Sequence, residues 1–169
     1  MITVFVLREG YYVAGENMEA AFHCSPATDD RGNPIFHELH HTYKVMFLAL
    51  QEVARKGMIR GDVVVYNDSR IIDELNGNIK PFDDICRKWQ LAICRELIPH
   101  IRSVVLFRKK ATDYIRSQIK IGESLLAPSD PVIMGALAYK IDEIEKDQAR
   151  SLKARVLDRF KGMWKHEQQ

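Results

Sequence analysis

The stretch VVVYNDSRIIDELNGN, residues 63–78, decides the fold. Its apolar, β-branched start predicts a buried strand that ends at Asn67, and a helical pattern begins directly after Ser69. A carboxylate, Asp68, therefore stands at the carboxyl end of a buried strand, in the turn before a helix. Asp and Ser in such a turn also favour a helix N-cap. From this stretch alone, Asp68 is either part of a functional site or part of a helix N-cap.

Patterns on both sides of this stretch predict an alternation of strands and helices. The expected elements are a strand at residues 2–7, two short antiparallel strands within 11–24, a helix through 45–54, a strand at 62–67, helices at 69–75 and 82–98, a strand at 103–107 and a helix at 112–121. This order predicts an α/β fold with a mixed sheet, in which the strands after each crossover lie parallel to the first.

Composition limits the class of protein. A chain of 169 residues, 46% hydrophobic and 28% charged, is typical of one soluble domain with a substantial core. The formal charge of +2 means that any nucleic-acid surface is a local patch. Three widely spaced cysteines favour buried thiols in a reducing compartment. The first residues lack the marks of a secretory signal, and no apolar run is long enough to span a membrane, so we expect a cytoplasmic location.

The last part of the chain differs in character from the rest. Residues 132–164 are strongly helical, with apolar residues recurring on roughly one face. We therefore expect a domain at 1–121 and a helical extension at 122–169. The apolar stripe of the extension either packs on its own domain or docks a protein partner.

The segment VVVYNDSRIIDEL, with HHTYKVMFLALQEVARKG before it and VVLFRKKATDYI after it, resembles the ribonuclease H family. The resemblance covers residue 1 to about residue 121. It implies a ribonuclease H-like α/β domain, with a mixed five-stranded sheet flanked by helices. It also implies a cluster of carboxylates that holds two Mg²⁺ or Mn²⁺ ions and cleaves phosphodiester bonds, as in an RNA/DNA hybrid.

The resemblance assigns a role to three carboxylates of this chain. Asp68 matches the family's ligand at the end of the fourth strand. Glu9, in LREG, lies where an Asp-Gly pair is expected, and Asp113, in KKATDYI, matches the aspartate of the last helix. Glu9, Asp68 and Asp113 are thus the expected catalytic and metal-binding residues.

The fourth expected ligand is missing. The family's helical glutamate falls between Thr42 and Phe47, where the sequence TYKVMF contains no carboxylate. Glu38 lies upstream and would act as a metal ligand only if the helix were extended, or its register shifted, by at least one turn. Because the protein's task in such a site is to fix the coordination of the metals, this departure predicts a degraded site.

Basic and aromatic residues offer a nucleic-acid surface. Arg108, Lys109 and Lys110, with Arg116 and Lys120 beyond them, would contact a phosphate backbone, or form ordinary solvated surface. Tyr11 and Tyr12 would stack on bases or, as is more usual beside a strand, pack in the core.

Three histidines, His37, His40 and His41, raise the question of a zinc site. Residues 37–41, HELHH, fit the letters of the H-E-x-x-H zinc motif, with His37 and His41 four residues apart, but the three cysteines do not strengthen this interpretation, and surface or loop histidines are the usual case, which we expect here.

Two functions from different classes follow from these features. The first is a ribonuclease H-fold protein with a degraded metal site, which serves in nucleic-acid association or protein interaction with weak or no catalysis. The alternative is a divergent Mg²⁺- or Mn²⁺-dependent nuclease acting on RNA/DNA hybrids or another nucleic acid.

Overall fold

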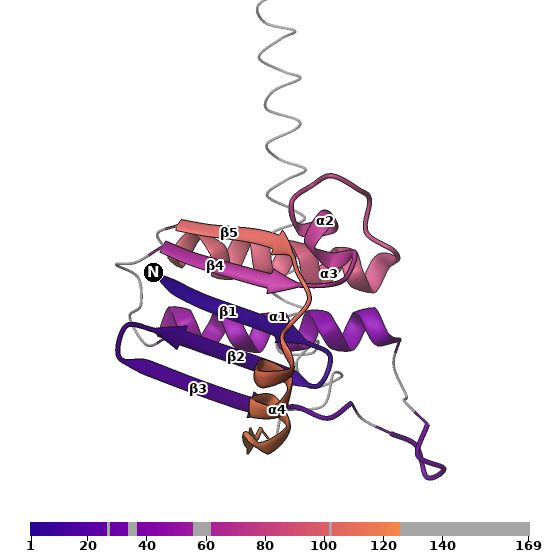
Figure 1. Ribbon diagram of the computed structural model, residues 1–169. Coiled ribbons are helices and arrows are strands. Elements are labelled where there is room, and N and C mark those ends of the chain that lie inside the picture. Colours follow the sequence, from indigo (N-terminus) through magenta and orange to yellow (C-terminus); the bar gives the residue numbers. More distant parts are fainter. Residues whose placement is uncertain (27, 34–36, 56–61, 102, 126–169) are drawn as a thin grey trace, which may run out of the picture.

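The chain folds as an α/β structure around one mixed sheet (Figure 1). This is a computed structural model, and it describes residues 1–26, 28–33, 37–55, 62–101 and 103–125. The strands are β1 (Ile2–Leu7), β2 (Gly10–Gly15), β3 (Met18–His23), β4 (Asp62–Asn67), β5 (Ser103–Arg108) and β6 (Glu123–Ser124). The helices are α1 (Glu38–Arg55), α2 (Ile71–Leu75), α3 (Asp84–Ala92) and α4 (Asp113–Ile121).

The six strands lie in the order β5-β4-β1-β2-β3-β6. β1, β2 and β3 form the expected antiparallel meander. β4 runs parallel to β1 and β5 runs parallel to β4, which confirms the prediction that the strands after each crossover are parallel to the first. β6 was not predicted, and it pairs with β3 beyond residue 121, where we expected the domain to end.

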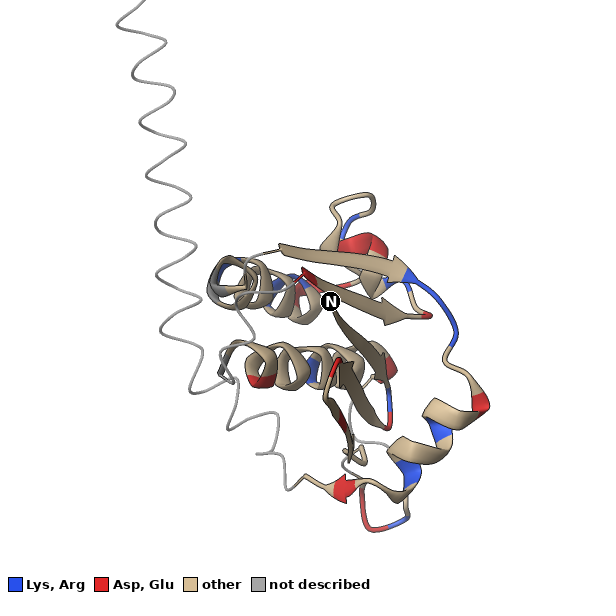
Figure 2. Ribbon diagram, turned by 60° about the vertical axis from the view of Figure 1, so that its left-hand side comes forward, with Lys and Arg blue, Asp and Glu red and all other residues tan. Residues whose placement is uncertain are grey.

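Both faces of the sheet are covered, because the central strands are apolar on both sides. In β1, Val4 and Val6 point into the larger of two hydrophobic clusters, while Phe5 points into the smaller. α1 and α3 pack over the larger cluster on one face, and α4 crosses the other face (Figures 1 and 2). Tyr11 and Tyr12 are buried, one in each cluster, so they pack in the core.

The sheet ends on one side at β5. This strand pairs only with β4 within the described residues, and its side chains at Val105 and Phe107 are 42% and 52% exposed. α4 lies on β2 and β3 and leaves this end of the sheet face open.

The helix α1 begins about two turns earlier than the apolar pattern indicated, at Glu38. His40 and His41 lie in this added part and are buried, so the expectation of surface or loop histidines was wrong for both. His41 Nε2 bonds to the backbone oxygen of Cys24 at 3.0 Å, and His40 bonds to Asp83. The sequence did not indicate that His40 and His41 are buried, because their partners Asp83 and Cys24 are distant along the chain.

Other predicted elements are close to the observed ones. The expected helix at 82–98 is α3 followed by a π-helical segment, η2 (Ile93–Leu97), and a short 3₁₀ segment, η3 (Ile98–His100). Cys24 and Cys86 are buried and are not in disulfides, as predicted, and Cys94 is half-buried. No described helix is both long and apolar enough to cross a membrane. The helix expected at 132–164 lies outside the described residues.

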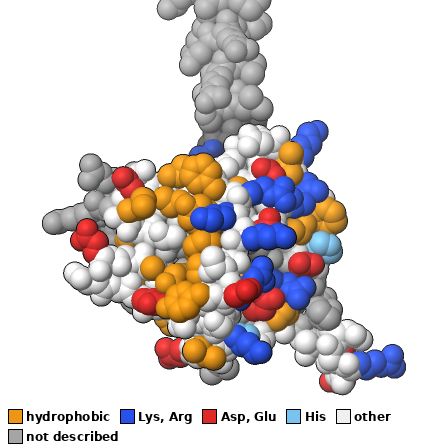
Figure 3. Space-filling model, in the orientation of Figure 1, with side chains coloured by type: hydrophobic (Ala, Val, Ile, Leu, Met, Phe, Trp, Pro, Cys, Tyr) orange, Lys and Arg blue, Asp and Glu red, His pale blue; other side chains and the backbone are white. Residues whose placement is uncertain are grey.

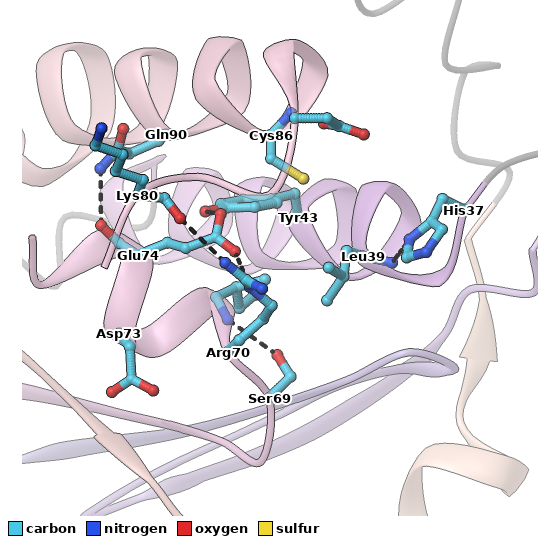
Figure 4. Close-up of polar contacts among 12 residues, drawn as sticks. His37, Leu39, Tyr43, Ser69, Arg70, Asp73, Glu74, Lys80, Cys86 and Gln90 are labelled. Carbon is cyan, nitrogen blue, oxygen red and sulfur yellow. Dashed lines mark hydrogen bonds and ion pairs between the residues drawn. The ribbon is translucent and has the colours of Figure 1, made fainter. Parts of the chain in front are cut away.

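A buried carboxylate anchors α2 behind the Asp68 turn (Figure 4). Glu74 is completely buried, and it accepts hydrogen bonds from Tyr43 Oη of α1 at 2.9 Å and from Arg70 Nε at 2.8 Å. Its backbone oxygen accepts from Gln90 Nε2 of α3 at 2.7 Å. Because α1 and α3 both hold Glu74, the turn that precedes α2 has a fixed position.

Replacing Glu74 with alanine is expected to lower the free energy of unfolding by about 2–3 kcal/mol, because the buried Tyr43 hydroxyl loses its acceptor and the partly exposed Arg70 loses its partner. The measurement is urea unfolding monitored by circular dichroism. Asp73→Ala is the control on the same helix: it removes only the exposed pair with Arg108, at 3.1 Å, and should cost about 1 kcal/mol or less. Equal losses in the two variants would contradict an anchoring role for Glu74.

Candidate functional site at the ends of the parallel strands

A pocket of about 240 Å³ lies where β1 and β4 end. The carboxyl ends of parallel strands meet at one edge of a sheet, which is a common place for ligand sites in α/β folds. This volume is large enough for a phosphate group or a hydrated ion. The pocket is lined by Phe5, Val6, Leu7, Arg8, Glu9, Glu38, Thr42, Asn67, Asp68, Ser69, Lys109, Ala111 and Arg116.

The Asn67-Asp68-Ser69 turn presents Asp68 to this pocket. Asn67 is buried, and its Nδ2 donates to the backbone oxygen of Val6 at 2.6 Å, which ties the end of β4 to β1. Ser69 Oγ donates to Asn67 Oδ1 and accepts from the backbone N–H of Ile71 at 3.4 Å. Asp68 is exposed and makes no hydrogen bond in the described part of the chain. Any weak capping thus falls to Ser69, and Asp68 remains open to a ligand.

Glu9 enters the pocket from the turn after β1. The next residue, Gly10, lies so close to β3 that a Cβ atom there would be 2.0 Å from the backbone oxygen of Phe22. The backbone oxygen of Glu9 accepts from the N–H of Cys24 at 2.6 Å. The close approach and this hydrogen bond together fix the backbone of the turn, while the Glu9 side chain remains half-exposed.

Glu38 reaches the pocket from the first turn of α1. It stands one turn before Thr42, and both residues line the pocket. Thr42 Oγ1 donates to the backbone oxygen of Glu38 at 2.9 Å. The extension of the helix, which the sequence left open, thus places a carboxylate one turn from the position where the family resemblance expects one.

The positively charged side chain of Arg8 lies among these carboxylates. Arg8 Nη1 is 3.7 Å from Glu38 Oε1, and Arg8 Nη2 is 4.0 Å from Glu9 Oε1. All three side chains are about half-exposed or more, so each pair contributes at most about 1 kcal/mol to stability. The Arg8 charge is therefore important for the electrostatics of the pocket rather than for the stability of the fold. Arg8 was not among the residues predicted for the site, although its place beside Glu9 at a strand end could have indicated it.

The expected basic residues divide into two groups. Lys109 lines the pocket with its Nζ 5.0 Å from the centre of the Tyr66 ring, and Arg116 reaches the pocket from α4. Arg108 pairs instead with Asp73, and Lys110 is exposed outside the lining. Figure 2 shows the basic segment that leaves β5, and Figure 3 shows Lys and Arg gathered with Asp and Glu on this side.

Asp113, which the resemblance also assigns as a ligand, lies in the first turn of α4 and is not among the residues that line the pocket. The helix there is capped by Thr112, whose Oγ1 accepts from the N–H of Ile115 at 3.3 Å. The structure thus brings together Glu9, Glu38 and Asp68 and leaves Asp113 outside.

The donor chemistry of the pocket suits a hard cation, but its arrangement does not fit a two-metal centre. Among the described residues, one group of three His, Cys, Asp or Glu side chains has its potential ligand atoms within 4.8 Å of one another, and it lies elsewhere. In the pocket, three carboxylates face three cations, Arg8, Lys109 and Arg116. Of these cations Arg8 pairs with Glu9 and Glu38, two of the carboxylates that a metal would otherwise bind.

Gly10→Ala is expected to destabilise the protein by at least about 2 kcal/mol, because β3 or the turn must move to accept a Cβ atom 2.0 Å from a backbone oxygen. Thermal unfolding measures the loss. Gly77→Ala is the matched control: Gly77 has a positive φ of 78° but no atom within 4 Å of its Cβ position. A smaller loss at Gly10 than at Gly77 would show that the approach of β3 does not restrict the turn.

No family model, curated protein or solved structure matches this chain. The pocket itself therefore carries the functional assignment.

Proposed function

We propose that this chain is a ribonuclease H-like domain that binds the phosphate backbone of nucleic acid at this pocket, with weak or no catalysis. The arrangement of β1 to β5 supports the resemblance, because it combines a three-stranded meander with two further strands parallel to the first. The Asn67-Asp68-Ser69 turn stands where the resemblance expects the ligand of the fourth strand.

The observation that carries the proposal is the guanidinium of Arg8 between Glu9 and Glu38. It offsets part of the charge of these two carboxylates without a metal. Lys109 and Arg116 then remain to face an anionic ligand on the same pocket wall. Arg and Lys are the usual partners of backbone phosphates, and such contacts do not depend on base sequence.

A second pocket extends this surface. It shares Leu7, Glu9 and Arg116 with the first, and it adds His23, Ile119 and Lys120. Arg116 thus stands between two adjoining hollows, with Lys120 one turn further along α4. Successive phosphates of a strand would meet these cations in order, so we expect an extended backbone as the ligand rather than a single phosphate.

Binding of a fluorescent RNA/DNA hybrid should weaken steeply as KCl rises, because counterions are released from the phosphates. Lys109→Ala should reduce the slope of log K against log salt by about one. Fluorescence anisotropy in EDTA measures both quantities without divalent metal.

Lys80→Ala is the control for this measurement, because Lys80 is an exposed lysine outside both pockets. It should leave the salt slope unchanged. The proposal fails if the protein does not bind the hybrid at low salt, or if the Lys109 and Lys80 variants have the same slope.

A divergent nuclease is the second candidate, and the position of Glu38 favours it. Glu38, Glu9 and Asp68 line one pocket, so a helical carboxylate is present, one turn from its expected place. If a metal binds, these three residues would hold it, and it would activate water for phosphodiester cleavage. Arg8 must then move away from Glu9 and Glu38.

If the nuclease candidate is right, hybrid cleavage with Mn²⁺ should be slow in the natural protein, faster in Arg8→Gln and lost in Asp68→Asn. Removing Arg8 frees two carboxylates, while the Asp68 variant removes a ligand that has no protein partner. The measurement is product formation on a denaturing gel over a Mn²⁺ titration. Arg31→Gln, in the exposed loop before α1, is the control for loss of a positive charge. Cleavage that persists in Asp68→Asn would exclude a metal role for this pocket.

A further inference from the structure

A second cluster of potential ligands lies away from the pocket, where α1 meets α3. His40 comes from the first turn of α1, Asp83 caps the start of α3, and Cys86 lies in the first turn of α3. One potential ligand atom of each residue lies within 4.8 Å of the others. None of the three lines the pocket at the strand ends.

We propose that His40, Asp83 and Cys86 form a binding site for a zinc-class divalent cation, with the fourth position left to water. Imidazole nitrogen, thiolate sulfur and carboxylate oxygen are the three donor types that Zn²⁺ accepts, and three protein ligands plus water complete a tetrahedron.

Three contacts show that the ligand atoms converge. His40 Nε2 is 2.6 Å from Asp83 Oδ2. The other oxygen, Oδ1, accepts from the backbone N–H of Cys86 at 2.8 Å, which fixes the carboxylate at the helix start. Cys86 is completely buried, and its thiol also interacts with the Asp83 carboxylate. Figure 4 shows the Cys86 sulfur on the side of α3 that faces α1.

The charges of the cluster suit a dication. A Zn²⁺ ion with one thiolate, one carboxylate and one neutral imidazole has no net charge, which a largely buried site requires. Binding would replace the hydrogen bond between His40 and Asp83 with two metal bonds, and the Cys86 S–H proton would pass to water. Burial, followed by the bond to Asp83, raises the pKa of the free thiol to about 12, so this proton is present before the ion binds.

The sequence spacing of the region is consistent with the site. Asp83 and Cys86 are separated by two residues, as are His37 and His40. Two intervening residues are common between paired cysteine ligands of structural zinc sites, and Asp83 and Cys86 share that spacing. The ring of His37 lies 5.6 Å from that of His40, so a second imidazole is close to the proposed ion. The sequence does not bring His40 and Cys86 together, because they lie 46 residues apart on two different helices.

The site also has a purely structural explanation, because the same three residues tie α1 to α3 without an ion. Hydrogen bonds from Cys86 and His40 outweigh the burial of Asp83 and lower the pKa of its carboxyl group. A tie of this kind would not produce a metal–sulfur bond. The test therefore observes that bond directly.

The experiment is a Co²⁺ titration of the full chain after EDTA treatment, monitored by absorbance. We expect a thiolate-to-cobalt charge-transfer band and tetrahedral d–d bands that saturate at one equivalent and disappear when Zn²⁺ is added. Cys86→Ser should abolish the charge-transfer band and weaken Zn²⁺ binding by more than about 100-fold, since even residues that only orient a ligand contribute 10- to 100-fold. Asp83→Asn, which can still cap the helix, should weaken binding while the protein remains folded.

Two controls locate the effect. Cys24→Ser alters the other fully buried thiol, which lies outside the cluster, and should leave the band unchanged. Asp68→Asn alters the pocket at the strand ends and should leave the charge-transfer band unchanged, because that pocket has no thiolate. The proposal is overturned if the natural protein shows no charge-transfer band, or if the band survives in a folded Cys86→Ser variant.

Discussion

The parallel pairing of β4 with β1 is the constraint on which the rest of the structure depends. It sets Phe5 opposite Tyr66, and it is held at its end by the hydrogen bond from Asn67 to the backbone of Val6. A slip of one residue would turn the buried valines of β4 to the wrong face of the sheet. It would also carry Asp68 away from Glu9. The fold and the pocket are therefore stabilised by the same register.

Much of the architecture could be predicted from local patterns. β1 and β4 are apolar on both faces, and such strands belong at the centre of a covered sheet. The start of α1 could not be predicted in this way, because HELHH is polar and the burial of His40 and His41 involves Asp83 and the backbone of Cys24, which are distant along the chain. β6 has two residues, too few for any periodicity.

The candidate site was predicted unevenly for a physical reason. Asp68 follows a strand whose end is clear in the sequence, so its place at the sheet edge could be inferred. The ion pair between Arg8 and Glu38 could not be inferred, because it joins the end of β1 to the start of α1 across the pocket. Asp113 shows the opposite failure: a residue of the right type in the right element lies outside the pocket lining. Local sequence identifies an element, whereas the side chains that meet depend on how elements pack.

The exposed strand at the end of the sheet has a consequence for solubility. β5 offers unpaired backbone groups and the apolar side chains of Val105 and Phe107 within the described residues, which together form a template for pairing with another chain. The strand ends at Arg108, and Lys109 and Lys110 follow it directly. Positive charges that flank an apolar edge oppose such pairing, since two copies would bring like charges together. The same basic run would thus protect the monomer from aggregation, whatever ligand the pocket binds.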